Sequence, residues 1–172
     1  MRKPNIDAYL TVIVTEKDGK VVYRRRYKSR SFVVGFLNAL YPVFVALGNP
    51  SNRFGNPNIV VGSGTAKPTI NDTGLESQIG NGTGAGQLQY GRDSLTTPVA
   101  NTNTNTASMT WSKSFTNGSG GNVTVSEVGA YINVNTTSGS TTYFILHDLL
   151  PSPITLSPNQ VLTVVYTLTI ST

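Results

Sequence analysis

Most of this chain consists of runs in which apolar and polar residues alternate, with short turn clusters between them. Near the C-terminus, every second residue from 162 to 170 is apolar or aromatic. Alternation with a period of two places successive side chains on opposite faces of a strand. Similar runs occupy residues 8–16, 21–28, 108–116 and 123–134, and shorter apolar strands are expected at 59–61 and 142–146. The pattern predicts a chain built mainly from β-strands.

The composition supports the same fold class. The 172 residues include 23 Thr, 16 Asn and 16 Ser, and only 12% are charged. Coiled coils and most helical bundles need more Ala, Leu, Glu and Lys than this chain has. Turn clusters at 117–122, 135–140 and 151–159 have the spacing typical of sandwiches and barrels. We predict one domain spanning residues 1–172, an antiparallel β-sandwich of jelly-roll-like or immunoglobulin-like type.

An N-terminal β-hairpin is expected at residues 8–28. Leu10, Val12 and Val14 share one face of its first strand, and Asp18-Gly19 separates that strand from the second. An Asp-Gly pair between alternating runs predicts a tight type I′ turn, in which both central residues have positive φ. The hairpin should therefore form locally.

The apolar spacing changes to three and four after the hairpin, which predicts one short amphipathic helix at residues 31–41. Ser31 is placed to cap its start and Pro42 to end it. Residues 48–58 are expected to form a loop. Residues 66–106 are polar and weakly periodic, and they predict an exposed excursion with at most one helical turn, capped by Asp72, at residues 72–79.

Positive charge is concentrated at the start of the chain. Nine of the 13 basic residues lie in the first 30 positions, which carry a net charge of +6. The candidate partner-binding residues are Arg24, Arg25, Arg26, Lys28 and Arg30. Such a run most often forms a solvated face or a guarded sheet edge. An acidic protein partner is the next alternative, and a nucleic acid, with Tyr23 and Tyr27 stacking on bases, is the third.

Groups suited to catalysis are few, because the chain has no Cys, one His and eight carboxylates. His147 and Asp148 are neighbours in a strand, so their side chains should point to opposite faces, and we expect His147 to be a polar residue at a strand end. Residues 62–67 are Gly-rich, but Pro68 prevents the helix that a phosphate-binding loop requires. We therefore expect no enzyme, cofactor or metal site, an expectation that a buried cluster of convergent ionisable side chains would contradict.

The order of elements from residue 8 onward resembles that of a diffuse group of structural proteins of tailed phages and archaeal viruses. The shared features include an N-terminal hairpin, a helix that opens with Ser-Phe-Val at 31–33, and a strand at 111–115 that ends in an aromatic residue. Residues 59–75 have the sequence IVVGSGTAKPTINDTGL, residues 123–131 have VTVSEVGAY, and residues 162–170 alternate as the final strand does in that group. The resemblance implies a structural signature formed by Gly62, Gly64, Thr65, Asp72, Leu75, Glu127 and Gly129.

The resemblance also implies a non-enzymatic virion protein, such as a capsid, decoration, head-fibre, tail or baseplate component. Such a protein would form homo-oligomers and bind other virion proteins, and its basic segment could dock on an acidic shell. The first residues contain no signal-peptide pattern, and no apolar run is long enough to span a bilayer, so we expect synthesis in the host cytoplasm. Two alternatives are a receptor- or glycan-binding lobe using residues 80–106 and Trp111, and nucleic-acid binding. The alternation around Trp111 favours a core position for it.

Overall fold

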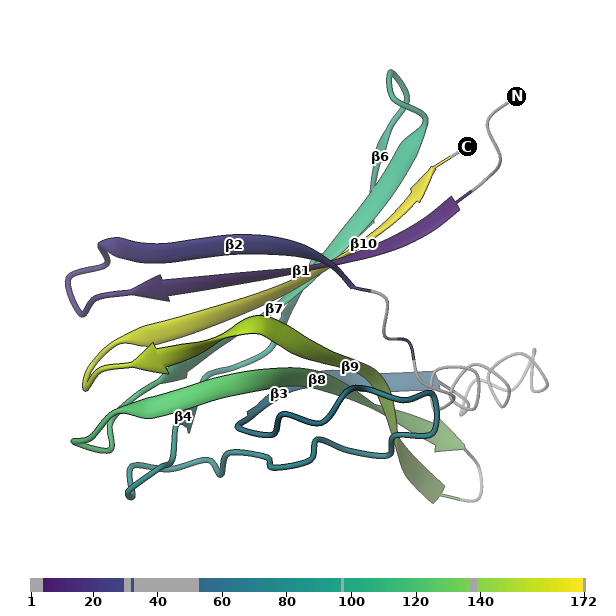
Figure 1. The fold of residues 1–172 in the computed structure, drawn as a ribbon. Coiled ribbons are helices and arrows are strands. Elements are labelled where there is room, and N and C mark those ends of the chain that lie inside the picture. The colour runs from purple at the N-terminus through teal and green to yellow at the C-terminus, as the bar shows by residue number, and fades with distance from the viewer. Residues whose placement is uncertain (1–4, 30–31, 33–52, 97, 137–138, 172) are drawn as a thin grey trace. The chain divides into compact units, whose positions relative to one another are not determined.

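The computed structural model describes residues 5–29, 32, 53–96, 98–136 and 139–171, and every regular element among them is a β-strand (Figure 1). The mainly β, antiparallel fold class is confirmed, and the strands form two sheets, as those of a sandwich do. The helix predicted at residues 31–41 lies outside the described residues except for Phe32, which forms an isolated β-bridge with Leu146. No described helix is long and apolar enough to cross a bilayer.

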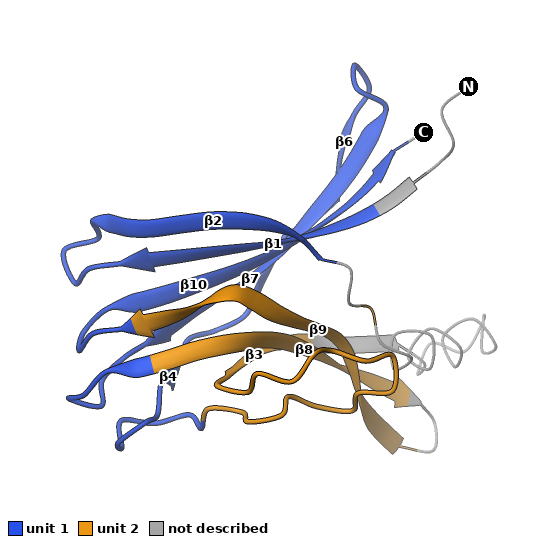
Figure 2. Cartoon of the chain, in the orientation of Figure 1, with its two compact units in different colours: residues 1–30, 80–123, 156–172 blue, residues 31–79, 124–155 orange. Residues whose placement is uncertain are grey.

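The chain divides into two compact units (Figure 2). Unit 1 combines residues 1–30, 80–123 and 156–172, and unit 2 combines residues 31–79 and 124–155. Each unit is thus assembled from segments that are distant in the sequence.

Unit 1 contains a seven-stranded sheet, here called the large sheet. Its main strands are β2 (Val21–Ser29), β1 (Asn5–Thr15), β10 (Val161–Ser171) and β7 (Thr106–Thr116), in that order. The far side of β7 pairs with three short strands, β4 (Gln89–Tyr90), β5 (Ser94–Leu95) and β6 (Val99–Asn101). One edge of the large sheet is therefore the long strand β2, and the other is made of short pieces.

The two faces of the large sheet differ as the alternation predicts. Val12 lies opposite Val164 of β10, and Tyr166 of β10 lies opposite Trp111 of β7. The buried positions on this face include Leu10, Val12, Val14, Leu162, Val164, Tyr166, Trp111 and Phe115. The opposite face of β10 and β7 carries half-buried Thr, Ser and Val side chains and no charge. We call it the hydroxyl face, and it comprises Val161, Thr163, Val165, Thr167, Thr110, Ser112, Ser114 and Thr116.

The predicted hairpin is present, but its turn differs from the predicted type. Among Asp18 and Gly19, only Gly19 has a positive φ, of 86°. The Gly19 amide donates to the Glu16 carbonyl at 2.9 Å, and the Lys20 amide donates to Asp18 Oδ1 at 3.0 Å. These bonds describe a three-residue loop with glycine in the left-handed region, which is the usual alternative to a two-residue type I′ turn.

Unit 2 is built on a three-stranded sheet, here called the small sheet, in the order β3 (Arg53–Gly62), β8 (Val123–Thr136) and β9 (Gly139–Leu156). β3 begins inside the loop predicted at 48–58, so that boundary was wrong. β9 likewise passes through Pro151 and Pro153, where a turn was predicted. β9 is the last strand in its sheet, and an edge strand tolerates proline because one side needs no amide donor.

The segment predicted as an exposed excursion, residues 66–106, divides between the two units. Ile79 and Leu88 within it are buried, and β4, β5 and β6 attach part of it to β7. Residues 98–105 at its end are exposed, as predicted. Residues 72–79 contain no helical turn, because the Asp72 side chain bonds elsewhere, as described next.

Candidate functional site

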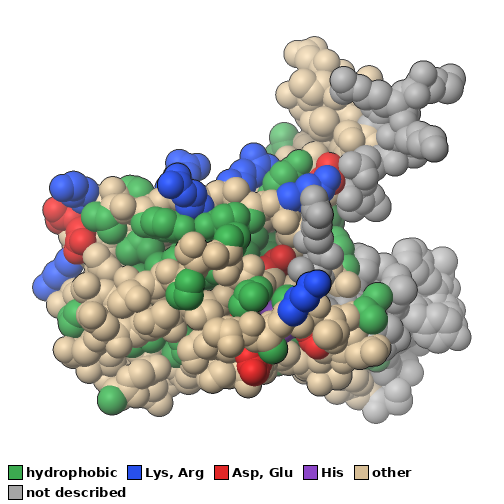
Figure 3. All heavy atoms as spheres, viewed as in Figure 1, with side chains coloured by type: hydrophobic (Ala, Val, Ile, Leu, Met, Phe, Trp, Pro, Cys, Tyr) green, Lys and Arg blue, Asp and Glu red, His purple; other side chains and the backbone are tan. Residues whose placement is uncertain are grey.

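The first candidate site is the edge strand β2, whose cations lie on both faces of the sheet. Arg24 and Arg26 lie opposite Ile13 and Thr11 of β1, on the same side as the hydroxyl face, whereas Arg25 lies opposite Val12 on the other side. All three arginines are exposed, and Figure 3 shows the cations gathered along this strand. We call Arg24, Arg25, Arg26 and Lys28 the basic edge. Arg30, the fifth predicted partner-binding residue, lies outside the described residues.

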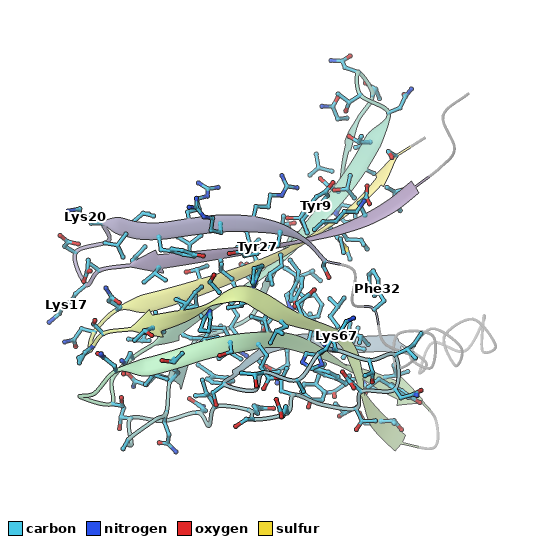
Figure 4. The ribbon with its side chains drawn as sticks, in the orientation of Figure 1. Tyr9, Lys17, Lys20, Tyr27, Phe32 and Lys67 are labelled. Carbon is cyan, nitrogen blue, oxygen red and sulfur yellow. The ribbon has the colours of Figure 1, made fainter. Side chains whose placement is uncertain are left out.

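Several side chains of the basic edge also hold the hairpin together. Lys28 forms an ion pair with Asp7, and the Arg26 guanidinium lies 4.1 Å from the centroid of the Tyr9 ring. Within the described chain, the Arg24 side chain forms no hydrogen bond or ion pair. Tyr9 lies along the hairpin, with Lys17 and Lys20 near its turn (Figure 4). Lys28 and Arg26 are thus held in position, while the basic edge presents exposed guanidinium groups to solvent.

A tyrosine pair lies on the other face of the same strand. The Tyr23 and Tyr27 hydroxyls are 2.9 Å apart. Burial, together with the hydrogen bond to Tyr23 and its charge, raises the pKa of Tyr27 to about 12, although Arg25 acts in the opposite direction. The two rings are half-buried and linked through their hydroxyls, and the Arg25 guanidinium lies 5.9 Å from the centroid of the Tyr23 ring, which leaves less ring surface for base stacking.

The second candidate site is a buried histidine between two carboxylates. His147, in β9, is 3% exposed, and its Nδ1 lies 2.6 Å from Asp72 Oδ2 while its Nε2 lies 3.0 Å from Glu127 Oε2. A neutral imidazole has one N–H and can donate to only one of these partners. If both contacts of His147 are hydrogen bonds, His147, Asp72 and Glu127 must together hold two protons, one in each bond. We call Asp72, Glu127 and His147 the carboxylate cluster.

This cluster contradicts the expectation that the ionisable groups do not converge. His147 also lies well inside β9 and not at a strand end. The sequence placed Asp72 and Glu127 in the resemblance signature. Glu127 and His147, 20 positions apart, lie on either side of the turn predicted at 135–140, whereas nothing in the spacing of Asp72, 75 positions from His147, indicates contact. Pairing of β8 with β9 brings Glu127 to His147, and the loop that follows β3 brings Asp72.

Glu127 is the centre of the hydrogen-bond network. Its Oε1 accepts the amides of Gly64 at 3.0 Å and Ser77 at 2.8 Å, and its Oε2 accepts the amide of Glu76 at 3.0 Å. All three amides belong to residues 63–79, here called the fastened loop. Charge-assisted hydrogen bonds of this kind are about twice as strong as neutral ones. One buried carboxylate therefore ties both ends of the loop to β8.

Two further carboxylates close the loop on itself. Glu76 Oε2 accepts the amides of Thr65 and Ala66 at 2.6 and 2.7 Å, and these bonds hold the pKa of Glu76 below its ordinary value of 4.5. Asp72 accepts the Thr69 amide and hydroxyl. Burial raises the pKa of Asp72, but the bonds from Thr69 and the contact with His147 outweigh it and bring the pKa below 3.8.

The glycines of the signature allow neighbouring residues to pack closer to the backbone than a side chain would permit. A Cβ at Gly62 would lie 2.6 Å from the Ser77 carbonyl and would also overlap the Glu127 carboxylate. A Cβ at Gly129 would lie 2.5 Å from the Phe144 ring and 2.8 Å from Leu75 Cδ2. All seven residues of the resemblance signature therefore belong to one network, in which the fastened loop packs on the small sheet.

The Gly-rich residues 62–67, rejected above as a phosphate-binding loop, do bind anions with their backbone. The amides of Gly64, Thr65 and Ala66 all donate to carboxylates of the chain itself. Such successive amides form an anion-binding nest. Here Glu127 and Glu76 already occupy it.

Comparison with family models, with curated proteins and with solved structures found no match. The described residues include no group of His, Cys, Asp or Glu side chains arranged to hold a metal ion. The chemistry of the two candidate sites therefore has to be argued from their own geometry.

Trp111, the aromatic residue of the glycan-binding alternative, is 8% exposed, so the predicted core position is confirmed. Its ring centroid lies 6.1 Å from that of Tyr166. Its indole Nε1 is buried without a hydrogen-bond partner in the described structure. A buried ring cannot stack on a sugar at the surface, so Trp111 is unsuited to that role.

Proposed function

We propose that this protein is a non-enzymatic structural component of a viral particle, which forms homo-oligomers and binds neighbouring particle proteins. The resemblance to structural proteins of phages and archaeal viruses supplies the class. The hydroxyl face of the large sheet is the observation that carries the proposal, because it is a broad surface that can be buried with little desolvation of charge.

The row that crosses this face illustrates the point. Val165 of β10 and Ser112 of β7 lie opposite each other on this face, and Thr11 of β1 continues the row toward Arg26 of the basic edge, where the uncharged surface ends. Short hydroxyl and branched side chains are half-buried here and have little rotamer freedom to lose. Burying a charge costs far more than burying a hydroxyl that finds a partner. A face of this composition supports permanent contact between protein subunits.

The carboxylate cluster favours a structural role over catalysis. Both ring nitrogens of His147 contact carboxylates, and both oxygens of Glu127 accept backbone amides. A general base needs a lone pair directed at a substrate. The groups of this cluster are instead committed to the fastened loop.

The mass of the purified protein in solution, measured by sedimentation over a range of concentrations, tests the proposal. We expect a defined oligomer, and we expect Val165→Glu, on the hydroxyl face, to dissociate it without unfolding the chain. Thr102→Glu, in the exposed turn after β6, is the matched control and should leave the oligomer intact. A monomer at every concentration that also fails to associate with purified particles would contradict the proposal.

A further inference from the structure

We propose that the outer side of β2 is a docking edge for an acidic, extended segment of a different protein, which adds to the large sheet as a further strand. The inference rests on the proposed function only for the identity of that protein as another particle component. It commits to one mode of recognition, in which backbone hydrogen bonds supply pairing and alternate side chains supply specificity.

The topology of the large sheet provides the edge. β2 pairs with β1 on one side, and the described residues place no strand on its other side. The opposite edge of the sheet is different, because β4, β5 and β6 cover much of β7. A long strand with an open side presents a row of unpaired amides and carbonyls. Residues 21–27 of β2 are enough to pair with a segment of strand length.

The charge of β2 selects the partner. Arg24 and Arg26 share one face of the strand, and Val22 lies at the bulge next to the hairpin turn. A partner strand with acidic residues at alternate positions would place carboxylates beside Arg24 and Arg26, and an apolar residue beside Val22, which is 47% exposed. Opposite charges across neighbouring strands are favourable, and like charges are unfavourable.

A second copy of the chain does not suit this edge. Antiparallel pairing of β2 with another β2 would bring arginines of one copy beside those of the other, without intervening carboxylates. Only Glu16 and Asp18 among the eight acidic residues are two positions apart, and both lie at the hairpin turn. The occupant is therefore another polypeptide, and homo-oligomers form elsewhere on the molecule.

Binding of a designed peptide tests the inference. The probe is a blocked peptide as long as β2 that alternates glutamate with valine and threonine, titrated by calorimetry at low salt. A version methylated on alternate backbone nitrogens keeps every charge but cannot pair as a strand. We expect the unmethylated peptide to bind, to slow hydrogen exchange in β2, and to bind at least about tenfold more tightly than the methylated one.

Protein variants test the role of charge. The double variant Arg24→Glu and Arg26→Glu should weaken peptide binding by about tenfold or more, since two attractive pairs become repulsive. Arg92→Glu, an exposed cation away from β2, is the matched control and should bind as the parent does. Circular dichroism of both variants establishes that the sheet is intact.

Three results would overturn the inference: equal binding of the methylated peptide, unchanged hydrogen exchange in β2, or tighter binding of a single-stranded oligonucleotide than of the peptide. The sedimentation experiment above is independent of all three. If the protein is a monomer but binds the peptide, the proposed particle role is contradicted and the docking edge is supported. If it is an oligomer that does not bind the peptide, the docking edge is contradicted and the proposed role is supported.

Discussion

At the level of single residues, Glu127 is the side chain on which the fastened loop depends. Replacing it by Gln in Glu127→Gln keeps the volume but replaces one acceptor oxygen by an N–H₂ group that faces donors. Breaking a buried charged network in this way costs about 3–5 kcal/mol. We expect urea unfolding to show a loss of that size.

The exposed carboxylate Glu76 provides the comparison. It accepts two backbone amides, as Glu127 accepts three, but it lies in solvent. Glu76→Gln should therefore destabilise the chain much less than Glu127→Gln. If both variants lose the same free energy of unfolding, burial is not the reason that Glu127 stabilises the chain.

Trp111 offers a second residue-scale test, because its indole N–H is buried without a partner. Trp111→Phe removes that donor and keeps most of the ring, so we expect a change within about 1 kcal/mol. Trp111→Ala leaves a cavity and should cost about 3–5 kcal/mol. Thermal unfolding of the two variants measures the difference, and a Phe variant as unstable as the Ala variant would reveal an unseen acceptor for the indole.

At the level of elements, the hairpin turn depends on the backbone of Gly19. A Cβ there meets nothing within 4 Å, so any cost of Gly19→Ala comes from its positive φ. That cost is about 1–2 kcal/mol for a residue with a side chain. Gly121→Ala is the matched control, because Gly121 is also open and lies outside the left-handed region. Chemical denaturation should separate the two variants.

The fastened loop should respond to acid before the sheets do. The folded pKa values of Asp72 and Glu76 lie below 3.8 and 4.5, so ionised carboxylates stabilise the folded loop. This stabilisation is complete above those ordinary values and is lost as pH falls through the lowered ones. Hydrogen exchange of the Thr65 and Ala66 amides should therefore lose protection below about pH 4. Glu76→Gln should remove most of that pH dependence at these two amides.

The elements that follow a local rule were predictable, and those that depend on distant partners were not. The alternation at Leu10, Val12 and Val14 identified the buried face of β1, because side-chain direction in a strand has a period of two. The hairpin also followed from local sequence, although the loop type did not. β9 runs through Pro151 because it is an edge strand, and strand order is a property of the whole sheet.

The carboxylate cluster was missed for the same reason. His147 was judged by its neighbour Asp148, whereas its contacts are with Asp72 and Glu127. The resemblance signature contained both carboxylates, and the turn predicted at 135–140 could have placed Glu127 near His147 on the neighbouring strand.

At the scale of the whole molecule, the two proposed surfaces should respond differently to salt. The hydroxyl face carries no charge, so oligomers formed through it should change little between low and high salt. Acidic peptides bound to the basic edge should dissociate as the salt concentration rises, because salt screens the attraction between their carboxylates and the arginines. Sedimentation and calorimetry across one salt series measure both, and an oligomer that dissociates in salt would place its interface on charged residues instead.

The hub position of Glu127 also dictates an order of events during synthesis. The amides of Gly64, Glu76 and Ser77 leave the ribosome 50 to 63 residues before the carboxylate that holds them. Until β8 emerges, these three amides lack their buried acceptor, and only Glu76 and Asp72 of the loop itself are available to bond its backbone. The fastened loop can therefore reach its final form only after β8 has been made, so that a later strand gives shape to a segment translated well before it.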